Sequence, residues 1–598
     1  MREADPADHV VSRVACIVLA IVFLVGLLHL WVRLRDVQVE SAADYGYASA
    51  RQSFRRVQIC GSRGRILDCK GRVLADNRTS ISIDCRPASF QQKTWEAMVQ
   101  NIESNIVRLG ELIGRKPQVE TKTIRRHIRQ SIAMPLTIWR DIRAAEVARF
   151  AEHESEFPGF ELSEREERVY PNGSLAAHLL GYVGRDRGKS AAGDEQFSYF
   201  SPEMRGRAGI EYYYDDYLRG SSGERKLLVD ARGFSIHEWT VVEPQKGLDV
   251  HLTLDQELQR VVEHQLKGEC GACVVLDPRT GNILAAASLP EFNPNDFVPT
   301  LKADLYDRLS SDSNQPLLDR AFGGSYAPGS TFKPIVALAG LTLGYPADKT
   351  YCCDGRFGMG SMVIRCARRW GHGEMDLRHA MMKSCNPFFC NLGMDIGTNA
   401  LLQAAFAFGL GARTGIDFGV DACGIIPDAE LKMRKYNEPW FAGDLAQMSI
   451  GQGMVLVSPL QMAIVAGALG TGYRVKPHLK AHSPTERHPL PFAAEHLKIV
   501  REGMSMVVDG DDGSRGGGWR GGENVAVKVS GKTGTAEVGR GLRRRKNTWF
   551  IAYAPRENPT VAIALVVENG ESGGSTAAPR VGAVLRHIFG TTRESEVN

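Results

Sequence analysis

Ser330 and Lys333 lie three residues apart, just before an apolar run at residues 335–343. Pro328 and Gly329 predict a turn, and a serine is favoured where a helix begins. A helix that is apolar on every side is expected to be buried. Burial lowers the pKa of a lysine, so a neutral Lys333 could accept the proton of Ser330, and the helix N-terminus favours negative charge beside the serine. The pair therefore predicts a serine nucleophile activated by a lysine.

Two later stretches strengthen this interpretation, because S-x-x-K alone is frequent by chance. Ser384-Cys385-Asn386 supplies S-x-N, and Lys532-Thr533-Gly534-Thr535 supplies K-T-G-T after a β-rich run at residues 525–529. The three motifs, in this order, are similar to the serine acyl-transfer signature of penicillin-binding proteins and β-lactamases. Three coincident matches in the right order are improbable.

The chain has 598 residues and a net charge of +4, which indicates several domains and no nucleic-acid or other polyanionic partner. Residues 14–32 are apolar except for His29, long enough to cross a bilayer. Arg33 and Arg35 follow, where a cleavable signal would have small residues. We expect a cytoplasmic tail at 1–13 and a transmembrane anchor at 14–33, although the flanking charges do not settle the orientation.

No nucleophile, acid or base constellation appears before residue 250, so residues 34–247 are interpreted as a structural pedestal. Residues 248–598 begin and end with strand patterns and have helical patterns between them. The expected strands are residues 271–277, 282–288, 525–529, 549–554 and 561–567, with a closing helix at 581–588. This order predicts an α+β fold, an antiparallel sheet with an all-α subdomain, and an active site between the two.

Four residues could bind a metal. Cys353, Cys366, His372 and Cys385 have the spacing C-x12-C-x5-H-x12-C. Three thiolates and one imidazole form a closed tetrahedral set that suits structural Zn²⁺. If Ser384 and Asn386 face the cleft, Cys385 could point behind it. The alternatives are a disulfide, buried free thiols, or substitution of a ligand by Cys352 or Asp354. Cys270 and Cys273 are better explained as packing in a buried strand.

From Arg63 to its end the chain resembles a class B penicillin-binding protein, and within that family the elongation-type penicillin-binding proteins 2. The pedestal carries Arg63-Gly64, Asp68, Gly71, Arg168, Tyr170-Pro171, Gly209 and Glu211, and the later part carries Arg365-Cys366, Gly371-His372-Gly373, Trp440, Gly443-Asp444, Gly451-Gln452-Gly453 and residues 459–463. Many relatives have Asp at the position of Asn386, and related sequences often carry Cys or Asp, His and Cys near the four candidate metal ligands.

The resemblance implies D,D-transpeptidation of peptidoglycan stem peptides, the reaction that β-lactams block, with no cofactor needed for the chemistry. It implies that Ser330 attacks the D-Ala–D-Ala carbonyl and that Lys333 accepts the proton. The other implied roles are proton transfer and donor binding by Ser384 and Asn386, and carboxylate binding by Lys532 and Thr533. Thr533, Gly534 and Thr535 are the implied substrate-binding residues, and the N–H groups of Ser330 and Thr535 are the implied oxyanion hole.

The resemblance also implies partners, since residues 34–247 are too short for a glycosyltransferase domain. It indicates a SEDS-family glycosyltransferase, other elongation-complex proteins, and a single-pass inner-membrane location with the catalytic domain in the periplasm. The alternatives are a division-type transpeptidase, a D,D-carboxypeptidase or β-lactamase with the same motifs, and a β-lactam sensor or inert scaffold.

Overall fold

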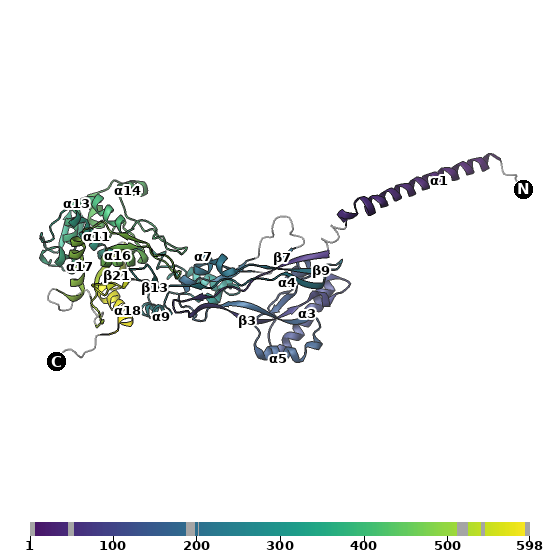
Figure 1. Ribbon diagram of the computed structural model, residues 1–598, viewed down its shortest axis with the longest axis horizontal. Coiled ribbons are helices and arrows are strands. Elements are labelled where there is room, and N and C mark those ends of the chain that lie inside the picture. Colours follow the sequence, from purple (N-terminus) through teal and green to yellow (C-terminus); the bar gives the residue numbers. More distant parts are fainter. Residues whose placement is uncertain are drawn as a thin grey trace.

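The structure is a computed structural model that describes residues 6–45, 53–186, 198–200, 203–360, 362–510, 519, 524–539 and 545–591. Figure 1 shows an elongated molecule with helix α1 at one end, the catalytic part at the other, and the pedestal between them. Of the predicted cytoplasmic tail, residues 1–5 lie outside the described residues.

Helix α1 (Pro6–Arg35) contains the predicted anchor. Among the described residues it is the one helix long and apolar enough to cross a membrane, and none of its apolar window is buried against the protein. Large exposed side chains such as Phe23, Leu24 and Trp31 therefore need a nonaqueous environment. A short π-helical turn, Asp36–Glu40, follows.

The pedestal is built on two main sheets and a strand pair. One sheet has the order β10-β9-β1-β7, and the other has the order β11-β2-β3-β4, with β5 also paired to β3. The bounds are β1 Phe54–Ile59, β2 Ile66–Leu67, β3 Val73–Cys85, β4 Leu136–Trp139, β5 Phe160–Val169, β7 Ser198–Phe200, β9 Gly223–Val229, β10 Ser235–Val242 and β11 Val250–His251. Strands β6 (Val183–Asp186) and β8 (Glu203–Gly206) form the pair.

Three helices cover one end of the pedestal: α3 (Trp95–Ile113), α4 (Thr121–Gln130) and α5 (Ala144–Glu152). The side chain of Thr94 accepts a hydrogen bond from the Ala97 N–H and caps α3. The apolar stripe of α3, including Ile102 and Ile106, packs in a core with Trp139. The short helices α6 (Ala177–Leu180), α7 (Gly209–Tyr213) and α8 (Asp215–Arg219) lie toward the catalytic part.

A buried charge network holds the pedestal together where these segments meet. Arg63 Nε and Arg168 Nε each lie 2.6 Å from one oxygen of the Glu211 carboxylate, which is fully buried. Arg63 also pairs with Asp215 at 2.7 Å. The two guanidiniums hold the pKa of Glu211 below its usual value even though burial acts in the opposite direction. Three of the pedestal motif residues, Arg63, Arg168 and Glu211, therefore form a structural ion-pair network.

The catalytic part has a five-stranded antiparallel sheet in the order β13-β12-β22-β21-β20. The strands are β12 Gly271–Leu276, β13 Ile283–Leu289, β20 Ser530–Val538, β21 Arg545–Ala554 and β22 Val561–Glu568. Cys273 and Val275 face helices α9 (Gln256–Leu266) and α18 (Ala578–Phe589), while Val274 faces the larger core with α11 (Lys333–Thr342) and α16 (Pro459–Thr471). The predicted α+β architecture is confirmed, and Cys273 packs in the core.

The helical subdomain lies between the two halves of this sheet in the sequence. Its helices are α10 Ala303–Ser311, α11 Lys333–Thr342, α12 Leu377–Met382, α13 Asn386–Ala407, α14 Ala429–Tyr436, α15 Ala442–Met448, α16 Pro459–Thr471 and α17 Ala494–Asp509. Its short strands are β14 Tyr351–Cys353, β15 Arg356–Met359, β16 Met362–Arg365, β17 Gly373–Met375, β18 Tyr473–Val475 and β19 Arg487–Pro489.

The prediction of a strand at residues 525–529 is wrong. Strand β20 starts at Ser530, so the K-T-G-T motif lies within the strand and not after it. Ser530 pairs with Tyr553 and the register runs toward Arg545. Continuing the ladder backward would bring residue 528 opposite Pro555, which has no N–H to donate. The β-rich composition of 525–529 therefore could not extend this sheet.

Candidate active site

Ser330 lies in a 3₁₀ turn, Gly329–Phe332, that leads directly into α11. Gly329 has a φ of +55°, and its N–H donates to the Gly451 carbonyl at 2.8 Å. A Cβ on Gly329 would lie 2.8 Å from the carbonyl oxygen of Thr535. The glycine thus allows the turn that carries the half-buried Ser330 to approach β20.

Lys333 is completely buried, as the sequence predicted. Its Nζ donates to the Ser384 carbonyl at 2.8 Å and to Asn386 Oδ1 at 2.7 Å, and lies 3.3 Å from Ser384 Oγ. Burial lowers the pKa of Lys333 to about 8. Within the described part of the chain no hydrogen bond joins Lys333 to Ser330, so the lysine is held by the S-x-N loop, one turn from the serine.

Lys532 approaches the same loop from β20. Its Nζ donates to Ser384 Oγ at 3.0 Å and to the Thr533 carbonyl at 3.1 Å. Burial, together with the nearby Lys333, lowers the pKa of Lys532 well below its usual value. The hydroxyl of Ser384 therefore lies between two buried amines, which suits a group that passes a proton from one to the other.

The S-x-N loop is held in a specific conformation. Ser384 has a φ of +53°, which is uncommon for a residue other than glycine. Asn386 begins α13, and its Nδ2 donates to the Arg365 carbonyl at 2.9 Å while its Oδ1 accepts from Lys333. The amide group of Asn386 thus connects Lys333 to the β15–β16 hairpin.

The remaining predicted residues lie on β20 beside the serine turn. Thr533 and Thr535 are half-buried. A Cβ on Gly534 would lie 2.8 Å from the Pro328 carbonyl, so only glycine lets β20 pack this closely on the turn. Thr535 Oγ1 accepts from the Gly573 N–H at 3.3 Å. All three motifs therefore meet at one place, although Ser330 and Lys532 are 202 positions apart in the sequence.

The four candidate metal ligands also come together, directly behind the S-x-N loop. The ligand atoms of Cys353, Cys366, His372 and Cys385 all lie within 4.8 Å of one another. His372 Nδ1 is 3.4 Å from Cys366 Sγ and 3.8 Å from Cys353 Sγ. The three cysteines are buried and His372 is half-buried. We call this group the cysteine–histidine cluster.

The donor chemistry of this cluster fits a metal ion. A hydrogen bond from Cys385 lowers the pKa of Cys366, and the same contact raises the pKa of Cys385. This is expected when one of two close sulfurs is a thiolate and accepts a hydrogen bond from the thiol of the other. The neighbours that could have replaced a ligand, Cys352 and Asp354, are exposed and stay outside the group. All cysteines of the chain are described and all are free, so no disulfide joins them.

Two backbone contributions to the site were not anticipated from the sequence. The carbonyl of Gly451 holds the serine turn, and the carbonyl of Arg365 holds Asn386. Both lie in stretches noted only for their family resemblance. Gly451 has a φ of +67°, so the Gly-Gln-Gly run was the available signal for a tight turn. No side-chain pattern marks the Arg365 carbonyl.

Comparison with known proteins assigns the class. Residues 271–586 match the penicillin-binding protein transpeptidase domain, and residues 58–252 match the penicillin-binding protein dimerisation domain. The chain therefore belongs to the penicillin-binding proteins of the serine transpeptidase class, whose chemistry requires no cofactor. The α+β fold with its pedestal and apolar N-terminal helix agrees with this family.

Several relatives share one name within that family. The chain is 31% identical to peptidoglycan D,D-transpeptidase MrdA of Escherichia coli K12, over 97% of this chain and 93% of that protein. It is 32% identical to MrdA of Acinetobacter baumannii, over 93% and 84%. Penicillin-binding protein 2 of Helicobacter pylori, solved in complex with MreC, superposes with a TM-score of 0.76 at 26% identity, covering 90% of this chain and 98% of that one.

A further solved structure has a similar overall fold. A chain solved in a peptidoglycan synthase complex that coordinates polymerization and crosslinking superposes with a TM-score of 0.70 at 28% identity. That match covers 98% of this chain and all of the other. The elongation-type interpretation is favoured over the division type by these relatives.

Proposed function

We propose that this protein is the elongation-type peptidoglycan D,D-transpeptidase of its host and a target of β-lactams. The observation that carries the proposal is the pair of buried lysines, Lys333 and Lys532, which share the Ser384 hydroxyl beside the Ser330 turn. A scaffold would have no need to bury two amines without a carboxylate partner, because burying a charge without a partner is costly.

The reaction begins with attack of Ser330 Oγ on the carbonyl of the penultimate D-Ala in a stem peptide. The neutral amine of Lys333 takes the hydroxyl proton, and a C–O bond forms as the peptide C–N bond breaks. The leaving D-Ala amine receives a proton through Lys333, Ser384 and Lys532. The amine of a second stem then attacks the ester, which releases Ser330 and makes the cross-link.

Substrate binding is assigned to β20 and the turn. Lys532 and Thr533 would bind the terminal carboxylate, Lys532 would supply positive charge, and Gly534 would contribute to the same substrate-binding strand. The N–H groups of Ser330 and Thr535 would stabilise the oxyanion, where each such donor is worth about 3 kcal/mol of barrier. Asn386, together with Ser384, would help to hold the donor peptide.

The first test is covalent trapping with a fluorescent penicillin. Ser330→Ala should abolish labelling, and Lys333→Ala should slow it by orders of magnitude, because the general base is lost. An adduct on the Ser330→Ala protein at the wild-type level, seen by intact-mass spectrometry, would show that Ser330 is not the nucleophile. A second assay separates a transferase from a carboxypeptidase by comparing cross-linked product with free D-Ala.

The cellular role has its own test. An elongation enzyme acts along the side wall, so depletion in a rod-shaped host should give round cells. Filaments on depletion would instead assign the protein to division. This outcome is independent of the trapping experiment, since both branches of the family form the same acyl-enzyme.

The cysteine–histidine cluster is proposed to bind structural Zn²⁺ through Cys353, Cys366, His372 and Cys385. A bound ion would fix the S-x-N loop from behind and supply no reacting group. Metal analysis of protein purified without added metal should find near-stoichiometric zinc, which His372→Ala should lose. A zinc-free wild-type protein, with a disulfide mapped between these cysteines, would contradict the proposal.

The domain organisation and topology follow from the same assignment. We propose a cytoplasmic tail at 1–13, an anchor at 14–33, a pedestal at 34–247 and a catalytic domain at 248–598 outside the cytoplasm, in the periplasm. Strand β11 pairs with β2 of the pedestal, so the chain leaves that sheet after His251. Protease accessibility in spheroplasts would test the orientation.

The complexes formed by the structural relatives support a proposal about partners. We propose a SEDS-family glycosyltransferase and an MreC-like elongation protein, supported by the two complexes in which the related chains were solved. Copurification of the full-length protein with each candidate from the host membrane would test this.

A further inference from the structure

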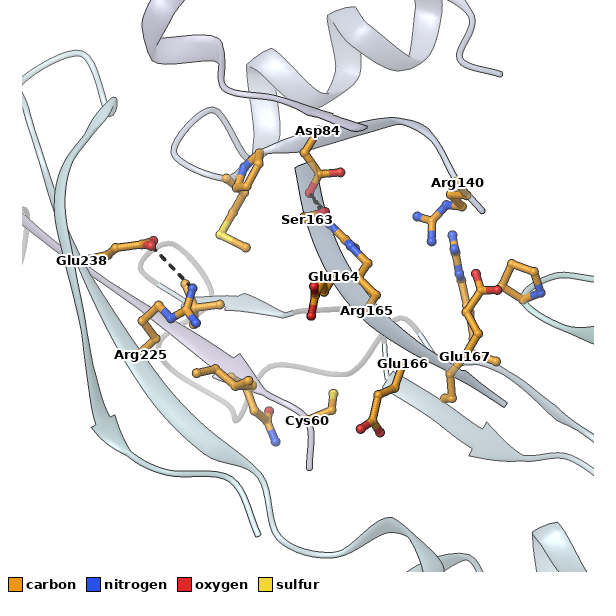
Figure 2. Close-up of a pocket in the computed structure, with 18 of the residues that line it drawn as sticks. Cys60, Asp84, Arg140, Ser163, Glu164, Arg165, Glu166, Glu167, Arg225 and Glu238 are labelled. Carbon is orange, nitrogen blue, oxygen red and sulfur yellow. Dashed lines mark hydrogen bonds and ion pairs between the residues drawn. The ribbon is translucent and has the colours of Figure 1, made fainter. Parts of the chain in front are cut away.

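A cavity of about 630 Å³ lies in the pedestal, far from Ser330, between β5 and the sheet that contains β1. Figure 2 shows β5 crossing this space, with Cys60 and Arg225 on the opposite side. None of the residues proposed for catalysis or metal binding lines it. We refer to it as the pedestal cavity.

The pedestal cavity runs along an unpaired strand edge. Strand β5 pairs with β3 along its whole length, and no other strand in the described ranges pairs with its second edge. Residues 163–168 all line the cavity. Because successive side chains point to opposite faces of a strand, a space that touches all of them lies along its edge. Such an edge presents free N–H and C=O groups that can pair with an incoming strand.

One side of the pedestal cavity carries an excess of arginine. Arg165 is neutralised by Asp84, with Nη2 2.7 Å from Oδ2. Arg140 and Arg185 line the same cavity, and neither guanidinium group has an ion pair or hydrogen bond with any residue that the structure describes. In Figure 2 Arg140 lies beside β5, and no dashed line reaches it. Both guanidiniums are half-buried.

The surroundings of these arginines favour an anion. Burial lowers the pKa of Arg140 to about 10, and repulsion by Arg185 and Arg165 contributes, while Asp84 and Glu167 act in the opposite direction without cancelling the shift. Burial and Arg165 lower the pKa of Arg185 in the same way. In the adjoining ion-pair network Arg168, which also lines the cavity, has a buried Nη2 without an acceptor. Unmatched guanidinium donors of this kind form strong hydrogen bonds with carboxylates.

The other face of β5 has the opposite character. Glu164 and Glu166 are exposed and alternate with Arg165 and Glu167 along the strand. Figure 2 shows Glu164 and Glu166 on the side of β5 toward Cys60. A strand added beside β5 would therefore bring its acidic side chains to one face only, over Arg140 and Arg185. The apolar residues Ile132, Ala133 and Met134 also line the cavity and suit apolar side chains of the same segment.

We propose that the free edge of β5 binds an extended segment of a partner protein, with acidic side chains over Arg140 and Arg185. Main-chain hydrogen bonds to β5 would supply affinity, and the arginines would select the charge. A small anion such as phosphate would meet the arginines but leave the backbone edge unpaired. The inference does not depend on the catalytic function, because the pedestal cavity and Ser330 lie in separate parts of the chain.

The test uses the full-length protein in detergent and a short synthetic peptide of alternating glutamate and valine. Three matched peptides accompany it: one with lysine for glutamate, one with glutamine for glutamate, and one N-methylated at alternate residues. We expect binding of the glutamate peptide alone. The double variant Arg140→Gln, Arg185→Gln should weaken it at least about tenfold, the loss expected for a hydrogen bond to a charged group.

Arg225→Gln is the matched control, because Arg225 lines the same cavity but already lies 3.7 Å from Glu238. It should leave peptide affinity unchanged. Unchanged penicillin acylation in every variant would show that each is folded. If the N-methylated peptide binds as tightly as the glutamate peptide, strand addition is overturned. If Arg225→Gln lowers peptide affinity as much as the double variant does, the effect comes from overall positive charge and not from Arg140 and Arg185. Binding of inorganic phosphate in place of the peptide, or self-association abolished by the double variant, would overturn the assignment of the occupant.

Discussion

Replacing Asn386 with aspartate tests the role of Lys333 directly, since Asn386 Oδ1 lies 2.7 Å from Lys333 Nζ. A full negative charge at that distance, screened as strongly as in bulk water, is worth about 1.5 kcal/mol, and burial can only increase it. About 1.4 kcal/mol corresponds to one pKa unit. The pKa of Lys333, about 8 in the native protein, should therefore rise by at least about one unit in Asn386→Asp.

The expected rate follows from the fraction of neutral lysine. At pH 7 a pKa of about 8 leaves about 9% of Lys333 neutral, and a pKa of about 9 leaves about 1%. Because only the neutral amine accepts the proton of Ser330, acylation by a penicillin should rise with pH and level off above the pKa of Lys333. The variant should react about tenfold more slowly at pH 7, and its whole profile should move to higher pH.

The assay is the second-order rate of acylation by a fluorescent penicillin between pH 6 and 10. Asn391→Asp is the control, since it adds the same charge further along α13. If Asn386→Asp lowers the rate equally at every pH, with no movement of the profile, Lys333 is not the titrating base. If the native profile has no rise near pH 8, the burial argument itself fails.

Three further changes test other parts of the structure. Glu211→Gln should lower stability by about 3–5 kcal/mol in urea unfolding, because it leaves the buried Arg168 without a carboxylate and Arg63 with Asp215 alone. Glu224→Gln, in a pair largely open to solvent, should change it by less than about 1 kcal/mol. Gly329→Ala should slow acylation at least about tenfold, since its Cβ would press on Thr535, while Gly344→Ala, also at positive φ but in open space, should not. Chelation of a metal in the cysteine–histidine cluster should slow acylation without abolishing it, as measured by penicillin labelling before and after zinc is restored.

The sequence by itself determined the chemistry. The motifs around Ser330, Ser384 and Lys532 identify a serine acyl transferase because each supplies a group that the reaction needs, whatever the distances between them along the chain. The burial of Lys333 was also predictable, since the helix that it begins, α11, is apolar on every side. Likewise the types and spacing of the four cysteine–histidine residues were sufficient to select them as one group.

Only the tertiary structure decided which groups touch. Lys333 bonds to the S-x-N loop and not to Ser330, because α13 brings Asn386 against it, a contact across 53 residues of sequence. The K-T-G-T motif lies inside β20 because strand pairing, and not β-propensity, sets where a strand begins. The pedestal cavity exists because β1 and β5, remote in sequence, face each other without pairing. The sequence specifies side chains and local periodicity, whereas unpaired edges and unmatched charges depend on which distant segments meet.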